Sequence, residues 1–118
     1  MIKDHGKNYN DLEKLIRQIN KEIPSEMKGF NELHHAVISE GALSVKTKEL
    51  IALGIAITVR CDGYIDYQIK NSLNAGASSS EILETIGVAI LMGGGPALIY
   101  GCEALEALNQ FIVLEKNG

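Results

Sequence analysis

The sequence of 118 residues contains no tryptophan, few aromatic residues (5%), two prolines and two cysteines. With so few aromatic side chains, the core must be built mainly from aliphatic ones. Two cysteines are too few for a disulfide scaffold, and we therefore expect a protein of the reducing cytoplasm. Hydrophobic residues make up 46% of the chain and charged residues 22%, proportions that are typical of a globular protein rather than a disordered one.

The sequence also lacks clusters of basic residues and long apolar runs. Its net charge is −4, and nucleic-acid binding needs grouped lysines and arginines, so we expect no nucleic-acid partner. The first residues, MIKDHGKNYNDLEK, are polar where a secretory signal would have its apolar core. The longest apolar run, residues 50–59, is too short to cross a bilayer. These features predict a cytoplasmic protein without a membrane partner.

Apolar residues recur at helical spacing along most of the chain, and this pattern predicts an all-α fold. A first helix is expected to begin at Asn10, with Glu13 as its capping partner, and to stop at Pro24. A second helix is expected to follow, capped by Ser25 and ended by Gly41.

The segment from Ser44 to Arg60 is locally ambiguous, because its apolar stretch would also suit a buried strand. Its length exceeds that of an ordinary strand and no turn signal divides it, so a third helix is expected. Asp62 is expected to cap a fourth helix, which Gly76 ends.

The last third of the chain predicts two more helices, giving six helices in one domain (residues 1–118). Ser78 and Glu81 form a capping box for the fifth helix, and Pro96 begins the sixth after the break GGGP. The sixth helix is expected to turn these apolar residues inward: Leu98, Cys102, Leu105, Leu108 and Ile112.

The third and fifth helices are apolar on too many sides for a chain of this length to cover. Soluble monomers rarely leave large apolar patches exposed. The pattern therefore predicts a homo-oligomer.

Cys61 stands between the third and fourth helices and is the first candidate for chemistry. A helix N-terminus favours a thiolate, whereas the neighbouring Asp62 carboxylate disfavours it. Residues Cys61, Tyr64 and Gln68 share one helix face through their i, i+3 and i+7 spacing. A lone cysteine is more often an inert, buried residue than a nucleophile, and both interpretations stay open here.

The block KTKELIALGIAITVRCDGYIDYQIKNSLNAGASSSEILETIGVAILMGGGPALIY resembles the carboxymuconolactone decarboxylase family, which includes alkylhydroperoxidase D. The elements that carry the resemblance are the Lys-Glu-Leu helix, the cysteine twelve residues after Glu49, the NAGAS turn and the MGGGPA break. The family core would span about 44–100. The resemblance implies an all-helical, alkylhydroperoxidase D-like domain that assembles as a homotrimer or homohexamer.

The redox members of that family use the motif Cys-x-x-Cys-x-x-x-His with an upstream glutamate. The resemblance places Glu49 at the glutamate and Cys61 at the first cysteine, which makes these two the candidate catalytic residues. Tyr64 stands where the second cysteine belongs and Gln68 where the histidine belongs, so both are assigned only to the pocket. The lactone-decarboxylase members use a histidine near this place, and that is not matched either.

No other pattern indicates a metal or cofactor site, and none is expected. His34 and His35 are adjacent, so they point in different directions on a helix and cannot chelate one metal together. Either histidine could line a pocket, but a solvated or packing role is the favoured expectation for both. The glycines at 93–95 do not match a phosphate-binding loop.

Three classes of function remain open. The first is a thiol-dependent, peroxide-reducing antioxidant protein with one motif cysteine, Cys61, reset by an external thiol. The second is a lyase-like enzyme on a small carboxylate or lactone, with Glu49 as base and Tyr64 as a hydrogen-bond donor. The third is a scaffold without catalysis that binds a small ligand or only assembles.

Overall fold

The computed structural model describes residues 3–117, and side chains as far as residue 114. This part of the chain contains six α-helices and no strand. Their bounds are α1 (His5–Glu22), α2 (Pro24–Ile38), α3 (Val45–Thr58), α4 (Asp62–Asn74), α5 (Ser79–Gly93) and α6 (Gly95–Asn117). The predicted all-α fold is confirmed, and the ambiguous stretch 50–59 lies in helix α3 and its C-cap.

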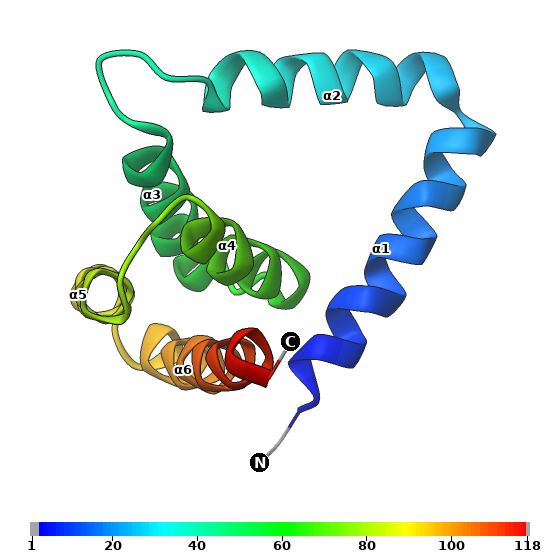
Figure 1. Ribbon diagram of the computed structural model, residues 1–118. Coiled ribbons are helices and arrows are strands. Elements are labelled where there is room, and N and C mark those ends of the chain that lie inside the picture. The colour runs from blue at the N-terminus through cyan, green and yellow to red at the C-terminus, as the bar shows by residue number, and fades with distance from the viewer. Residues whose placement is uncertain (1–2, 118) are drawn as a thin grey trace.

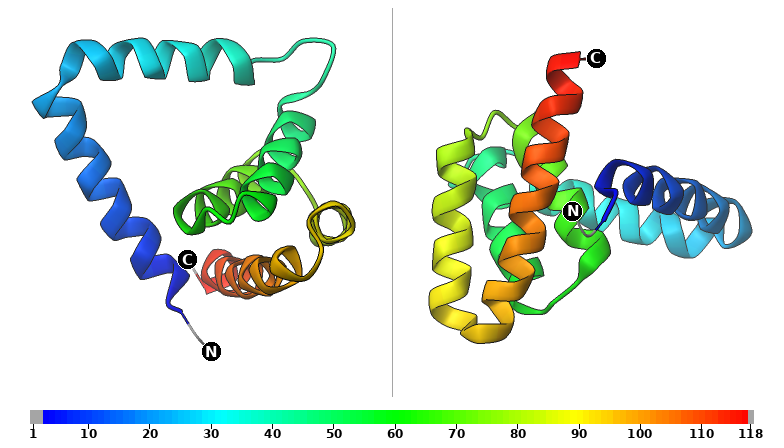
Figure 2. Two further views of the ribbon diagram at one scale, coloured as in Figure 1. Left: turned by 180° about the vertical axis from the view of Figure 1, so that it is seen from behind. Right: turned by 90° about the horizontal axis from the view of Figure 1, so that it is seen from below.

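Helices α3 to α6 form a bundle, whereas α1 and α2 form an arm that stands away from it (Figure 1). The start of α1 lies against α4 and α6, and α2 leads back to the beginning of α3. The turned views show the arm projecting from one side of the bundle (Figure 2). This arrangement sets α1 and α2 opposite α4, which carries the residues singled out from the sequence.

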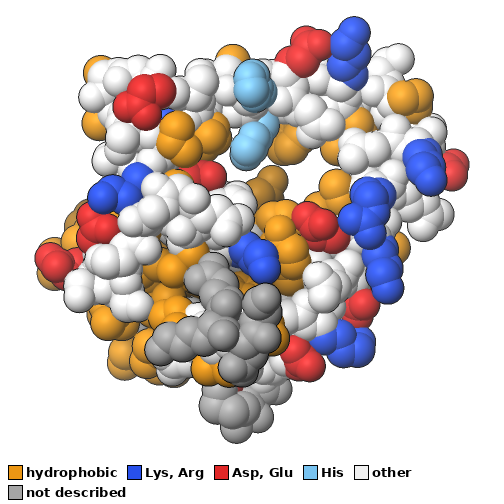
Figure 3. All heavy atoms as spheres, in the orientation of Figure 1, with side chains coloured by type: hydrophobic (Ala, Val, Ile, Leu, Met, Phe, Trp, Pro, Cys, Tyr) orange, Lys and Arg blue, Asp and Glu red, His pale blue; other side chains and the backbone are white. Residues whose placement is uncertain are grey.

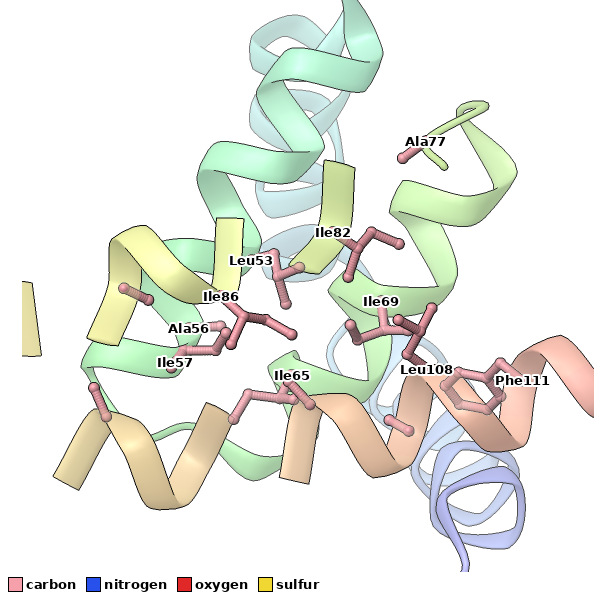
Figure 4. Packing of buried hydrophobic residues seen from close by; sticks show 14 residues of the cluster. Leu53, Ala56, Ile57, Ile65, Ile69, Ala77, Ile82, Ile86, Leu108 and Phe111 are labelled. Carbon is pink, nitrogen blue, oxygen red and sulfur yellow. The ribbon is translucent and has the colours of Figure 1, made fainter. Parts of the chain in front are cut away.

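The core of the bundle is aliphatic, as the composition predicts (Figure 4). Leu53 and Ile57 of α3 and Ile82 of α5 are fully buried, and they meet side chains from α4 and α6. Full burial of each such side chain contributes about 1.5–3 kcal/mol. Helix α3 is thereby fixed in the centre of the bundle, with α4 and α5 on either side.

Two predicted helix starts are confirmed by their hydrogen bonds. The Thr47 backbone N–H donates to Ser44 Oγ at 3.1 Å, which caps α3. At α5 the Glu81 N–H donates to Ser78 Oγ at 3.1 Å, and the Ser78 N–H donates to Glu81 Oε1 at 2.8 Å. These caps satisfy backbone donors that the first turn of a helix cannot pair internally.

The predicted start of the first helix is wrong. Helix α1 begins at His5 rather than Asn10, because Asp4 is its N-cap and its carboxylate accepts the Lys7 N–H at 3.0 Å. An aspartate cap satisfies the same backbone donors as a serine cap. The additional turn brings His5 into the protein interior.

Two further caps differ from the predictions, by two residues at α2, where Ile23 is the N-cap, and by one residue at α4. Pro24 occupies the first position of α2, where its missing N–H costs nothing, so Ser25 is already inside the helix. Cys61 rather than Asp62 is the N-cap residue of α4.

The inward side of α6 agrees with the prediction only in part, since Leu108 is buried and Ile112 packs against the core. Its buried side includes small residues: Ala97, Gly101, Ala104 and Ala107. Cys102 is exposed, and Leu98 and Leu105 are 49% and 40% exposed. A Cβ added at Gly101 would lie 3.1 Å from Ile86 Cγ2, so α5 and α6 approach too closely there for larger side chains.

Apolar side chains remain uncovered on the outer side of α3 and α5. These include Ile51, Ile55, Val88, Leu91 and Met92. A groove of about 420 Å³ runs between the two helices. By length and composition alone, α6 could cross a membrane over Gly95–Leu114, with 39% of that span buried; its small-residue side packs within the bundle, as a core helix does.

Candidate functional site

A pocket of about 470 Å³ lies between the arm and α4. Its walls are formed by Leu12, Ile16, Phe30, Asn31, His34, Cys61, Gly63, Tyr64, Tyr67, Gln68 and Asn71. Helices α1 and α2 contribute the aliphatic side chains and one phenyl ring, and α4 contributes most of the polar groups. In the space-filling view, the region enclosed by the arm and the bundle is hollowed (Figure 3).

Cys61 is placed by the sharp turn that joins α3 to α4. Its backbone N–H donates to the Ala56 carbonyl at 3.0 Å, and the Arg60 N–H donates to the Ile57 carbonyl at 3.2 Å. This pair of bonds is the Schellman arrangement, and it requires a left-handed residue, here Arg60 with φ 61°. The turn returns the chain beside α3 and leaves the Cys61 side chain partly buried at the pocket wall.

The start of α4 has no side-chain cap, since the cysteine occupies the capping position without accepting a hydrogen bond. Free backbone N–H groups at a helix N-terminus stabilise a neighbouring anion. The carboxylate of Asp62, which follows the cysteine, is paired with Lys3 Nζ at 2.9 Å. Lys3 Nζ also pairs with Glu103 Oε1 at 2.6 Å, so this cation offsets the negative charge of Asp62 only in part.

The structure brings Cys61, Tyr64 and Gln68 to one pocket, as their helical spacing indicates. Tyr64 is half exposed, whereas Gln68 is only 6% exposed. Gln68 Oε1 has no hydrogen-bond partner in the described part of the chain. Buried polar atoms are nearly always paired, so an unpaired amide oxygen on a pocket wall indicates a place where a ligand can donate a hydrogen bond.

Glu49 of α3 is 6% exposed and does not line the pocket itself. One of its carboxylate oxygens, Oε1, also lacks a partner within residues 3–117. Burial raises the pKa of the Glu49 carboxyl, and a positive charge on His34 acts against that shift. The carboxyl therefore lies within electrostatic reach of a side chain that does line the pocket.

His34 was expected to be solvated or to pack, with a pocket wall as the less favoured alternative, and no local signal placed it near Cys61. The structure puts it on the pocket wall opposite α4, whereas His35 lines a separate groove near the junction of α1 and α2. The two adjacent histidines do point in different directions, as predicted. His34 lies at the pocket because α2 leads back toward the bundle, and the residues around His34 in the sequence do not indicate this position.

A second polar cluster was missed altogether. His5 is 2% exposed, and its ring nitrogens contact Asp66 Oδ1 at 2.5 Å and Glu106 Oε1 at 2.8 Å. The Lys3 backbone N–H also donates to Glu106 Oε1, at 3.0 Å. Two acidic residues among apolar ones, Asp66 beside Ile65 and Glu106 beside Leu105, were the available signal.

Among the described residues, no three histidine, cysteine, aspartate or glutamate side chains are grouped in a way that would hold a metal ion. Cys61 and Cys102 are both free thiols.

Comparisons with known proteins agree with the fold and the pocket-forming helices. The sequence profile of the carboxymuconolactone decarboxylase family matches residues 24–107. An uncharacterised protein of Cupriavidus necator is 30% identical over 109 residues, covering 84% of this chain and 96% of the relative. An uncharacterised protein of Haemophilus influenzae is 32% identical over 107 residues, covering 91% and 95%.

Solved structures are similar over nearly the whole chain. The crystal structure of an apo carboxymuconolactone decarboxylase family protein from Legionella pneumophila has a TM-score of 0.88 at 40% identity, covering 91% of this chain and 96% of that one. A Thermotoga maritima protein has a TM-score of 0.83 at 33% identity, covering 93% and 100%. The description of another crystal structure from Thermotoga maritima names a family protein that is a candidate participant in an antioxidative response. This chain belongs to the carboxymuconolactone decarboxylase family.

Proposed function

We propose that the protein is a single-cysteine peroxidase that reduces organic hydroperoxides at Cys61 and is reset by an external thiol. The observation that carries the proposal is the position of Cys61. Its thiol stands at an uncapped helix N-terminus and on the wall of a pocket that also contains the unpaired amide oxygen of Gln68. The antioxidative association suggested for the Thermotoga maritima relative supports the same chemistry.

The reaction needs only one protein sulfur. The Cys61 thiolate attacks the terminal peroxide oxygen, the O–O bond breaks, and the products are a sulfenic acid and an alkoxide, which takes up a proton to become the alcohol. One external thiol then condenses with the sulfenic acid, releasing water and forming a mixed disulfide. A second external thiol attacks that disulfide, which regenerates Cys61 and leaves the small-molecule disulfide.

Residues of the arm support an organic substrate over hydrogen peroxide. Leu12, Ile16 and Phe30 supply apolar surface on the side of the pocket facing α4. An alkyl or aryl group on this surface would be removed from water, which is favourable by about 25 cal/mol per Å². The hydroperoxide O–H would be free to donate to Gln68 Oε1.

The proposal is tested by following the consumption of cumene hydroperoxide with an excess of a monothiol. We expect turnover by the unaltered protein, loss of turnover to the level of buffer in Cys61→Ser, and unchanged turnover in Cys102→Ser. Hydrogen peroxide should be the poorer substrate. Equal activity in the unaltered protein and Cys61→Ser would refute the assignment.

A non-redox enzyme is the second candidate, and one observation favours it. Burial raises the pKa of the Glu49 carboxyl, and a carboxylate of raised basicity is suited to abstract a proton from a small carboxylate or lactone. Tyr64 would then donate a hydrogen bond to the substrate. Saturable binding of small carboxylates or lactones, lost in Glu49→Gln and indifferent to Cys61→Ser, would favour this function over the peroxidase.

The working form is proposed to be a homo-oligomer, a trimer or hexamer. The uncovered apolar residues of α3 and α5 and the groove between these helices support contact with further copies of the chain. Sedimentation velocity should detect an oligomer, and Leu91→Glu should shift it toward smaller species. A folded monomer at micromolar concentration would contradict the assembly without affecting the assignment of Cys61.

A further inference from the structure

His34 lies opposite the candidate nucleophile, on the other wall of the same pocket. It belongs to α2, and histidine side chains on this helix are seen above the hollow enclosed by the arm (Figure 3). The residue is exposed, so its ring can exchange protons with water while facing the pocket. Helix α2 has no buried residue, so packing gives no reason for an imidazole at this position.

The proposed reaction requires a proton at a defined moment. When the O–O bond breaks, the leaving oxygen becomes an alkoxide in a pocket with apolar walls, where an unneutralised charge is costly. A positioned acid that protonates the leaving oxygen lowers this barrier. The thiolate itself cannot serve, because its proton was lost before the attack.

The side chains around the pocket leave few sources for that proton. Gln68 donates hydrogen bonds through its amide but cannot titrate. Burial, together with the Glu13 carboxylate, raises the pKa of Tyr67 to about 12, which makes its hydroxyl a poor acid at neutral pH. Of all side chains, only imidazole ordinarily changes its charge between pH 5 and 8.

Glu49 is the buried acidic group that interacts with His34. Burial raises the pKa of the Glu49 carboxyl, and a positive charge on His34 opposes that shift. Because His34 is exposed, its ring can take up from water the proton that it donates in the pocket.

The geometry points to His34 as the proton donor to the leaving oxygen, an inference that rests on the proposed peroxidase function. The Cys61 thiol gives up its proton to water, and the exposed His34 ring takes up a proton from water. The thiolate then attacks, the O–O bond breaks, and the His34 imidazolium protonates the alkoxide. The net change is one thiol and one hydroperoxide converted to one sulfenic acid and one alcohol. Position 68, which holds a glutamine, is not needed as a proton carrier in this scheme.

The adjacent histidine provides a matched control. His34→Gln keeps a hydrogen-bonding side chain of similar size but removes the titrating group, and His35→Gln makes the same change outside the pocket. For each full-length variant, the rate of Cys61 oxidation by cumene hydroperoxide is measured by quenched mass spectrometry. The rate of Cys61 alkylation by iodoacetamide is measured alongside, because iodide leaves without needing a proton.

We expect His34→Gln to slow oxidation about a hundredfold and alkylation by no more than about twofold, with His35→Gln changing neither rate beyond about twofold. A loss of pocket structure would slow both reactions, so the ratio of the two rates separates proton donation from a structural role. Oxidation of His34→Gln at the unaltered rate, or an equal loss in both reactions, would overturn the inference and leave the peroxidase function standing. No oxidation of Cys61 in the unaltered protein would overturn both.

Discussion

Two buried polar residues of α4, Asp66 and Gln68, are each 6% exposed but have opposite surroundings. Being two positions apart on a helix, they point to different sides. Asp66 contacts the buried ring of His5, which also contacts Glu106, and this cluster fastens the start of α1 to α4 and α6. Gln68 faces the pocket with an amide oxygen that no described residue pairs.

The difference separates polar groups that stabilise the fold from polar groups available to a ligand. In the His5 cluster the polar groups contact one another within the chain, and they come from three helices. Gln68 Oε1 on the pocket wall and Glu49 Oε1 in α3 have no hydrogen-bond partner among the described residues, although burial of such atoms costs free energy. Active sites are places where proteins keep such unfavourable arrangements.

The largest effect is expected from His5→Ala. Asp66 would lose its buried contact with the ring and Glu106 one of its contacts, and removing one partner of a buried ionisable pair costs about 3–5 kcal/mol of unfolding free energy. Burial already raises the pKa of Asp66, against the opposing effect of His5, so removal of the ring should raise it further. A group with a raised folded pKa stabilises the fold at low pH and loses that contribution as pH rises. The loss of unfolding free energy in His5→Ala should therefore be smaller at pH 5 than at pH 7.

Urea unfolding at both pH values measures this effect. His35→Ala, on the exposed side of α2, is the control and should change the unfolding free energy by less than about 0.5 kcal/mol. If His5→Ala and His35→Ala were equally stable, the cluster would not be what holds the arm.

For Glu49→Gln in α3, the change in unfolding free energy is expected to have the opposite sign. Burial raises the Glu49 pKa, so the ionised carboxylate opposes folding at pH 7, and its removal should stabilise the protein by about 1–3 kcal/mol. The gain should vanish as pH falls through the folded pKa, where the carboxyl is protonated in any case. Comparing thermal or urea unfolding at pH 7 and pH 4 checks the sign, while peroxide turnover should fall. A loss of stability at pH 7 would show that Glu49 is a structural residue like Asp66.

A smaller effect is expected from the turn that positions Cys61. Helices α3 and α4 both end in the same pattern of hydrogen bonds, but α4 uses Gly76 (φ 94°) where α3 uses Arg60 (φ 61°). A non-glycine residue in the left-handed region costs about 1 kcal/mol or slightly more. Arg60→Gly should therefore stabilise the protein by about that amount, and Gly76→Ala should destabilise it similarly. Equal and opposite shifts in unfolding free energy check the comparison, and destabilisation by Arg60→Gly would contradict it.

The smallest change in stability is expected from Gln68→Met. Replacing an unpaired buried amide by an apolar side chain of similar volume should alter the unfolding free energy by less than about 1 kcal/mol. The affinity for an organic hydroperoxide should fall, because the amide oxygen is lost. A loss of several kcal/mol in urea unfolding would mean that Gln68 is paired in the folded protein.

Local signals in the sequence were enough for most of the fold. The caps at Ser44 and at Ser78 with Glu81 involve residues three apart, so the local sequence is enough to predict them. The shared face of Cys61, Tyr64 and Gln68 follows from the period of one helix. For α6 the buried side was predicted correctly at Leu108 and Ile112 but not at Leu98, Cys102 and Leu105. A helix that is apolar on most sides has no clear period that identifies its buried side.

The features that were not predicted depend on contacts between distant parts of the chain. His5 and Glu106 are separated by 101 positions, and His34 faces a cysteine that belongs to another helix. No periodicity links such residues, because their proximity results from the packing of the arm. The resemblance to a known family supplied Glu49 and Cys61, but it could not supply a histidine that stands outside the matched motif.

A comparison of Cys61 with Cys102 in the same molecule tests most directly whether the pocket activates the Cys61 thiol. Cys102 is exposed and Cys61 only partly so, and exposure alone would make Cys102 the more readily oxidised thiol. The measurement is site-resolved mass spectrometry of dimedone-trapped sulfenic acid after brief treatment with cumene hydroperoxide. If the pocket activates its thiol, Cys61 will be labelled first and Cys102 will lag far behind. Labelling that follows exposure, with Cys102 ahead of Cys61, would contradict the account.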